Sequence, residues 1–221
     1  MNTSDLTICY YTAQTAPKAF VDETWKVLMK SAAAESYQLS VSVIKPDVAP
    51  SHFNIYRQAL EAAHGAKTKW IALCEDDMLY SPEHFKYRPK SKPFAYNLGY
   101  WGIYTWQDPP LYNYKGRRNL GNLICDRQAF IEAMEERFAK YPDPQGDRLK
   151  DIWAEPSKYE RQLGVTIREA EDFYTNPPNI KFSHETELSF QGLGTRKRAG
   201  ELRAYDIPYW GTAKKIRSIY Q

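Results

Sequence analysis

The chain has 221 residues, of which 43% are hydrophobic and 26% charged, and its formal net charge is +3. These values are typical of a globular protein and exclude the disordered and low-complexity classes. A chain of this length buries a sizeable core, so we expect a single α/β domain over residues 1–221.

Neither a leader nor a membrane span is indicated. The first residues, MNTSDLTICYYT, lack a basic start followed by a long apolar stretch, and no later window approaches the roughly 18 apolar residues of a span. Cys9, Cys74 and Cys125 lie in or beside apolar runs, without the spacing of zinc or redox motifs. We therefore expect a cytoplasmic protein whose cysteines are buried, reduced thiols.

The first part of the chain alternates strand and helix patterns. Residues 6–12 and 38–43 are typical of strands, and the apolar run 70–74 is typical of a third. Helical spacing of apolar residues predicts helices over 17–34 and 53–64, the second ended by Gly65. This order predicts an open, mostly parallel sheet flanked by helices, with right-handed crossovers.

After Pro82 the pattern changes. Residues 94–106 and 121–125 predict mixed or antiparallel strands on either side of a polar, Pro-rich loop. A helix with Asp126 as its N-cap is expected over 127–140, and another over about 147–163. Beyond Gly164 we expect an irregular C-terminal segment.

Three consecutive acids, Glu75, Asp76 and Asp77, follow the apolar run that ends at Cys74. Ligands of an open parallel sheet bind outside the carboxyl ends of its strands. Carboxylates this close raise one another's pKa unless a cation neutralises them, and Mn²⁺ or Mg²⁺ takes oxygen ligands while leaving positions open for phosphates. The acids therefore predict a metal and phosphate site. The alternative is that Asp76 or Asp77 caps the turn before Pro82 while the others are solvated.

The stretch WIALCEDDMLYSPEHF and the order of elements around it resemble the GT-A fold glycosyltransferases, nearest to the inverting family-two type, over roughly residues 6–190. The resemblance implies a metal-dependent transferase that moves a sugar from a nucleotide sugar, such as a UDP-sugar, to a hydroxyl acceptor with inversion. It implies a nucleotide-sugar-binding half over 1–92 and an acceptor-side half over 93–221. The family has an Asp-x-Asp sequence after this strand, which places Glu75 near the donor ribose, Asp77 on the metal and Asp76 on either; Glu75 departs from the family's Asp.

The resemblance extends to the rest of the donor pocket. Tyr11 and Thr12 on the first strand are expected to line the nucleotide, with Asn54 and Arg57 reaching towards the base or its phosphates. The family often has Arg-Asn where this chain has Tyr56 and Arg57, and an exposed helical charge is the alternative interpretation of Arg57.

The segment GNLICDRQAFIEAM resembles the family's acceptor-side segment beneath the donor sugar. Gly121 and Asn122 are expected to approach the sugar closely, because glycine lacks a Cβ; an ordinary strand-to-helix turn explains the same pattern. Related enzymes often carry a histidine metal ligand near the C-terminal segment, and His184 is our choice, although a lone histidine is more often structural.

The catalytic base should lie across from the metal. A carboxylate there would remove the proton of the acceptor hydroxyl, while the metal acts as a Lewis acid on the departing diphosphate. The Glu-Asp pair of the family points first to Asp172. Glu155, between aromatic residues and a Pro turn in WAEPSKYE, is second. Each is also compatible with a structural or solvated role.

Basic residues are concentrated in two segments. Residues 86–118 hold seven Lys and Arg against one acid (7 − 1 = +6), and residues 190–221 hold seven against two (7 − 2 = +5). Lys and Arg bind phosphates and the interleaved aromatic residues stack on bases, so these segments predict a polyanionic acceptor contacted by Arg196, Lys197 and Arg198. A hydroxylated base in DNA is the first acceptor that we consider, and a saccharide or lipid-linked sugar is the alternative.

Two other functions share these features. A nucleotidyltransferase also places acids on a metal beside a nucleotide, but it usually needs a Gly-rich basic loop after its first strand, and YYTAQTAPKAF offers little of that. A non-catalytic nucleic-acid-binding module would use the acids as turn caps. The sequence leaves the oligomeric state open.

Overall fold

The computed structural model describes residues 5–33, 37–43, 50–142, 155–188 and 202–220. The elements in chain order are β1 (Leu6–Thr12), α1 (Lys18–Ala32), β2 (Gln38–Val43), α2 (His52–Gly65), β3 (Trp70–Glu75), β4 (Met78–Leu79), α3 (Pro82–Lys86), β5 (Phe94–Asn97), β6 (Tyr100–Tyr104), β7 (Tyr112–Tyr114), the 3₁₀ turn η1 (Leu120–Asn122), β8 (Leu123–Asp126), α4 (Arg127–Lys140), α5 (Glu160–Leu163), β9 (Ala170–Phe173), β10 (Asn179–Ser183), β11 (Arg203–Ala204), β12 (Asp206–Ile207), β13 (Gly211–Thr212) and α6 (Ala213–Arg217).

A six-stranded sheet forms the centre of the fold, in the order β2-β1-β3-β8-β5-β9. β1 pairs in parallel with β2 and β3, and β9 in parallel with β5, whereas β8 is antiparallel to both its neighbours. The sheet is therefore mostly parallel with one reversed strand, which confirms the predicted α/β class and the mixed pairing expected after Pro82.

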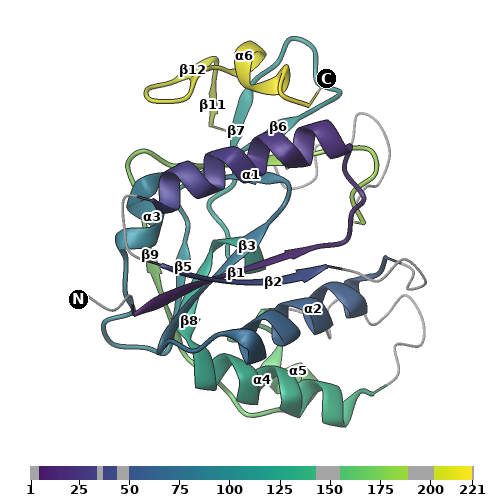
Figure 1. Ribbon diagram of the computed structural model, residues 1–221, viewed down its shortest axis with the longest axis vertical. Coiled ribbons are helices and arrows are strands. Elements are labelled where there is room, and N and C mark those ends of the chain that lie inside the picture. The colour runs from purple at the N-terminus through teal and green to yellow at the C-terminus, as the bar shows by residue number, and fades with distance from the viewer. Residues whose placement is uncertain (1–4, 34–36, 44–49, 143–154, 189–201, 221) are drawn as a thin grey trace.

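Helices cover both faces of this sheet: α1 lies on one face, and α2 and α4 lie on the other (Figure 1). Leu28 and Ala32 of α1 pack on Leu6 and Ile8 of β1, as the helical spacing predicts. α4 coincides with the predicted helix over 127–140, and the Asp126 carboxylate accepts the Ala129 N–H at 3.0 Å. Of the helix expected over 147–163, residues 155–163 are described: the expectation was wrong for 155–159, which form turns, bends and irregular chain, and only α5 is helical.

Gly65 was expected to end α2 as a cap, but it is the last residue of the helix, and the extended Ala66 follows it. A Cβ at Gly65 would lie 2.6 Å from the Ser40 hydroxyl oxygen. Glycine here leaves room for the Ser40 side chain of β2, and the chain does not turn into a left-handed conformation after it.

The expectation of an irregular chain after Gly164 was wrong for its first part. β9 forms one edge of the six-stranded sheet, and β10 lies inside a second sheet with the order β11-β7-β6-β10-β4. β7 of this sheet lies within the predicted Pro-rich loop. The second sheet packs against α1, where Phe20 contacts a cluster that includes Ile180 and Phe182 of β10, and the short C-terminal elements lie over it (Figure 1).

All three cysteines are buried and free, as expected. No helix among the described residues is long and apolar enough to cross a bilayer.

Candidate functional site

A pocket of about 130 Å³ lies where β1 and β3 end and β10 passes beside them. It contains six of the residues that the sequence predicts for the donor and the metal. Its lining consists of Tyr11, Thr12, Ala13, Thr15, His52, Ile55, Glu75, Asp76, Asp77, Lys181, His184, Glu187 and Leu188.

Side-chain hydrogen bonds join the carboxyl ends of the neighbouring strands β1 and β3. Tyr11 stands opposite Glu75 in the parallel ladder, and its hydroxyl donates to Glu75 Oε1 at 2.9 Å. The next residue, Thr12, donates its hydroxyl hydrogen to Asp76 Oδ2 and accepts the Gln14 N–H at 2.9 Å. Two predicted nucleotide residues therefore orient two of the three acids.

Asp76 is the most strongly perturbed of the acids. Its burial, and next the charge of Asp77, raise its pKa from 3.8 to about 7, although the Thr12 hydrogen bond acts in the opposite direction. The Thr24 hydroxyl donates to the Asp76 carbonyl oxygen at 2.8 Å and fixes the turn on α1. A carboxyl group that keeps its proton near neutrality marks a place where more negative charge is gathered than the protein neutralises.

Lys181 is a residue of this site that the sequence reasoning missed. Its ammonium donates to Glu75 Oε2 at 2.5 Å and to Asp77 Oδ1 at 2.9 Å. Burial lowers its pKa, but the charges of Asp77 and Glu75 outweigh burial and hold the pKa well above the usual range. The lysine is therefore charged at neutral pH.

His184 has the state that a metal ligand requires. Its burial, with the Lys181 charge as a second cause, lowers its pKa to about 4, so the imidazole is neutral. Its Nδ1 is hydrogen-bonded to the Thr186 hydroxyl at 2.8 Å, which leaves Nε2 for another partner.

The donor types present fit a divalent cation. Carboxylate oxygens of Asp76 and Asp77 together with a neutral imidazole are ligands that Mn²⁺ accepts. Within the described part of the chain, however, no three such groups already stand close enough to hold an ion. The ligands would have to draw together around an ion, at a place where Lys181 now contacts Asp77.

Gly121 and Asn122 lie beneath the acids. A Cβ at Gly121 would be 2.7 Å from Glu75 Oε2 and 2.8 Å from the Met78 sulfur, and the Gly121 carbonyl accepts the Tyr80 hydroxyl at 2.8 Å. Asn122 is fully buried and accepts the Asn179 amide at 2.8 Å. Gly121 therefore supports the Glu75 carboxylate, and the sugar contacts expected of both residues remain a prediction.

Gly121→Ala is expected to displace Glu75 and to lower the free energy of unfolding by about 1–3 kcal/mol, because the added methyl overlaps a carboxylate and a buried sulfur. Urea unfolding and the affinity for UDP would both be measured. Gly99→Ala is the control. A Cβ at Gly99 would lie 2.9 Å from the Thr175 backbone nitrogen, which is not part of the acidic pocket, so this variant should lose stability without losing nucleotide affinity. Unchanged UDP affinity in Gly121→Ala would show that Glu75 does not depend on this contact.

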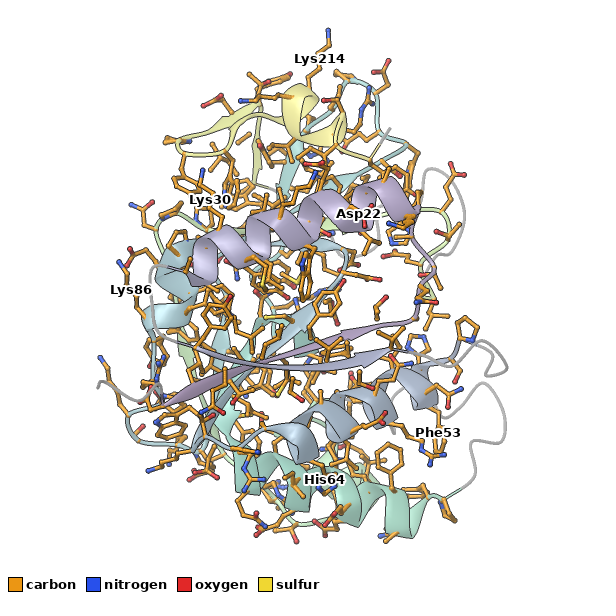
Figure 2. The ribbon with its side chains drawn as sticks, in the orientation of Figure 1. Asp22, Lys30, Phe53, His64, Lys86 and Lys214 are labelled. Carbon is orange, nitrogen blue, oxygen red and sulfur yellow. The ribbon has the colours of Figure 1, made fainter. Side chains whose placement is uncertain are left out.

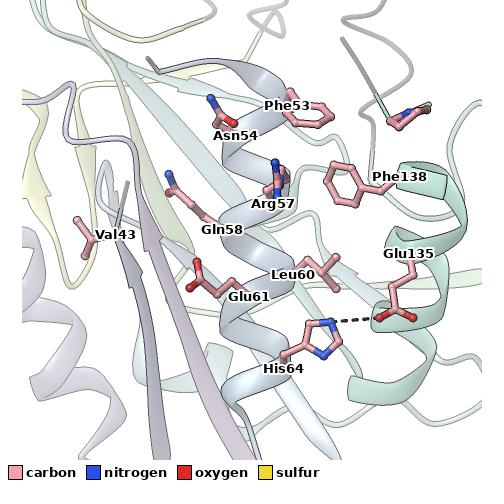
Figure 3. Close-up of a pocket in the computed structure, with 11 residues that line it drawn as sticks. Val43, Phe53, Asn54, Arg57, Gln58, Leu60, Glu61, His64, Glu135 and Phe138 are labelled. Atoms are coloured by element: carbon pink, nitrogen blue, oxygen red, sulfur yellow. Dashed lines mark ion pairs between the residues drawn. The ribbon is translucent and has the colours of Figure 1, made fainter. Parts of the chain in front are cut away.

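Asn54 and Arg57 lie apart from the acids. They line a groove of about 700 Å³ beside α2 and α4, in which His64 pairs with Glu135 at 3.2 Å (Figure 3). Arg57 is exposed, with its guanidinium 5.5 Å from the centroid of the Phe53 ring. The residues that α2 contributes to the acidic pocket are instead His52 and Ile55, which the sequence reasoning did not select.

The two candidate bases share one charged cluster. Arg118 donates to both carboxylate oxygens of Asp172, at 2.7 and 3.1 Å, and to the Ser157 hydroxyl at 3.0 Å. Glu155 pairs with Lys158 at 3.0 Å, and Lys158 donates to the Arg118 carbonyl at 2.7 Å. Neither carboxylate lines the acidic pocket.

The charges of Glu155 and Glu75 act on one buried hydroxyl, that of Tyr56. Burial, and next the charge of Glu155, raise the pKa of the buried Tyr56, and the charge of Glu75 acts on the same hydroxyl.

The three residues expected to contact a polyanionic acceptor, Arg196, Lys197 and Arg198, lie outside the described residues.

No protein-family model and no curated protein sequence matches the chain. Two solved structures are similar. A glycosyltransferase involved in glycosylation of the major capsid of PBCV-1 is 12% identical over 80% of this chain and 92% of its own, with a TM-score of 0.48. A Drosophila β1,4-galactosyltransferase 7 mutant, in complex with manganese, UDP-Gal and xylobiose, is 11% identical over 90% of this chain and 82% of its own, with a TM-score of 0.50. The second likeness confirms the GT-A type of fold that the sequence predicts.

Proposed function

We propose that this protein is a metal-dependent glycosyltransferase that moves a sugar from a nucleoside-diphosphate sugar to a hydroxyl acceptor with inversion. One observation carries the proposal: Glu75, Asp76, Asp77 and His184 line one pocket at the carboxyl end of β3, which is where an open sheet binds its ligands. The Drosophila enzyme of the same fold was solved with manganese and UDP-Gal, which supports this choice of donor and metal.

The chain's own residues divide the work of binding. Asp77, Asp76 and His184 would hold a divalent cation, which supplies a Lewis acid for the diphosphate oxygens. Tyr11 and Lys181 fix the two oxygens of Glu75, so this carboxylate is oriented before it meets the ribose. Thr12 holds Asp76 towards the pocket. Contacts of this kind hold side chains in place in advance and so reduce the ordering that binding would require.

Glu155 is the base that the contacts favour. Both oxygens of Asp172 are engaged by Arg118, whereas Glu155 is paired with one lysine, and its charge acts on the Tyr56 hydroxyl as the charge of Glu75 does. As the base, Glu155 would take the proton of the acceptor hydroxyl on a carboxylate oxygen.

We retain a polyanionic acceptor, with a hydroxylated base in DNA as the specific case. The support lies in the basic C-terminal segment, where the exposed Lys214 of α6 projects into solvent (Figure 2); Lys86 of α3 is also exposed but pairs with Glu83 at 2.5 Å. Such charges bind phosphates, and an enzyme acting on a base must also take that base out of its stack.

UDP with Mn²⁺ is expected to raise the melting temperature by about 5–10 °C when present at 100 times its Kd, because a ligand of the folded state then adds about 2.7 kcal/mol. Differential scanning calorimetry would compare UDP alone, Mn²⁺ alone and both together, with UDP-Gal hydrolysis as a second readout. In Asp77→Asn the joint shift should disappear. A wild-type protein that shows neither a joint shift nor hydrolysis would contradict the proposed function.

A further inference from the structure

Lys181 occupies the centre of the acidic pocket because its strand places it there. The neighbouring residues Ile180 and Phe182 are fully buried and face the core of the second sheet, so the alternation of a strand turns Lys181 to the opposite side. The strand is held beside the acids by its backbone: the Phe182 N–H donates to the Asp77 carbonyl at 2.8 Å, and Lys181 stands opposite Met78 in the antiparallel pair.

The ammonium interacts with every group proposed to hold the metal or the donor ribose. It contacts Glu75 and Asp77 directly, and its charge lowers the pKa of both Asp76 and His184. The side chains of Lys181, Glu75 and Asp77 are only 22%, 19% and 10% exposed, so solvent screens these charges weakly. One positive charge thus offsets one of the two negative charges that it touches.

We propose that Lys181 is an internal counter-ion that competes with the divalent cation for Asp77 and Glu75, so that the cation binds tightly only together with a nucleoside diphosphate. A cation held by Asp77 would take the place of the ammonium at that carboxylate. The Lys181 ammonium would then be available as a partner for the negative charge of the diphosphate. This inference rests on the proposed function, since it concerns the order in which that site fills.

The ammonium also offsets part of the negative charge that Glu75 and Asp77 bring together. Removing one partner of a buried pair leaves the other charge uncompensated, which is strongly unfavourable. In Lys181→Met a bound cation would replace the missing positive charge beside Glu75 and Asp77, and its affinity should rise accordingly.

Mn²⁺ titration by isothermal calorimetry, without nucleotide, tests the competition. Lys181→Met is expected to bind Mn²⁺ at least about tenfold more tightly than wild type, the size of effect that groups around a metal's ligands produce. The control Lys92→Met removes the same charge from an ion pair of the same 2.5 Å length, with Glu169 on the surface, and should leave Mn²⁺ affinity unchanged. Lys181→Arg keeps the charge and should bind Mn²⁺ no more tightly than wild type.

The same titration with UDP present tests the coupling. UDP should raise the Mn²⁺ affinity of the wild type more than that of Lys181→Met, because the variant lacks the ammonium that would bind the diphosphate. If metal-free Lys181→Met unfolds, Mn²⁺ alone should restore its circular dichroism spectrum.

Three results would overturn the inference: Mn²⁺ affinity of Lys181→Met equal to or below wild type, tenfold tighter binding by Lys181→Arg, or an unfolded Lys181→Met that Mn²⁺ does not rescue. In each case tight wild-type binding of Mn²⁺ with UDP would leave the proposed function standing. Absence of that wild-type binding would instead remove the proposed function itself.

Discussion

Asp76→Asn is expected to lower sugar transfer by at least about 10³-fold and, in the same molecule, to stabilise the metal-free protein at pH 8. The loss of activity follows from the loss of one oxygen ligand for the cation and its several kcal/mol of charge stabilisation. The gain in stability follows from the pKa of about 7 that burial and Asp77 impose on this carboxyl group. Asparagine keeps the acceptor oxygen for Thr12 without the charge.

The sign of the pH dependence can be stated from that pKa. The folded-state pKa of Asp76 lies above the unfolded value of 3.8, so its stabilising contribution is complete below about pH 4 and is lost as the pH rises through about 7. Asparagine does not titrate, so the variant should gain about 2–4 kcal/mol over wild type at pH 8 and much less at pH 5.

Urea unfolding in EDTA at both pH values measures this difference. Asp22→Asn, which removes an exposed carboxylate paired with Lys18, is the control and should show no comparable dependence on pH. An equal difference in free energy of unfolding between Asp76→Asn and wild type at pH 5 and pH 8 would mean that Asp76 is ionised at both pH values. That result would contradict the raised pKa that its burial causes.

The elements that were predicted correctly are those whose sequence pattern lies within the element itself. The strand Leu6–Thr12 and the helix Arg127–Lys140 have the bounds read from the sequence, because an apolar run and a helical repeat with an Asp126 cap are visible in the chain itself. The three acids were found for a similar reason, since charge directly after a buried strand is costly without a function. His184 was placed only through the resemblance.

The missed elements depend on distant pairing. β9 and β10 are four and five residues long, and the charged residues Glu171, Asp172 and Lys181 interrupt their apolar pattern. Their partners, β5 and β6, lie more than 70 residues earlier in the chain. Lys181 was missed with its strand, although the alternation of Ile180, Lys181 and Phe182 was a usable signal.

Glu155→Gln is expected to lower kcat by about 10²–10⁴-fold, the contribution of a positioned general base, while the affinity for UDP and Mn²⁺ stays near that of wild type. The side chain is 12% exposed and keeps a polar partner, Lys158, after the change, so the fold should be retained. Asp172→Asn should lower kcat far less, because both oxygens of its 36% exposed carboxylate are held by Arg118 and are not available to an acceptor proton.

A pH profile separates a base from a residue that only positions the segment. If Glu155 accepts the proton, the acidic limb of the kcat/KM profile disappears in Glu155→Gln, and Glu155→Asp restores part of the rate together with that limb. A structural role would lower the rate and leave the limb in place. If Asp172→Asn is the more damaging change, Arg118 must release Asp172 in the acceptor complex and Asp172 is the base; if both variants turn over normally, the proton leaves through another group.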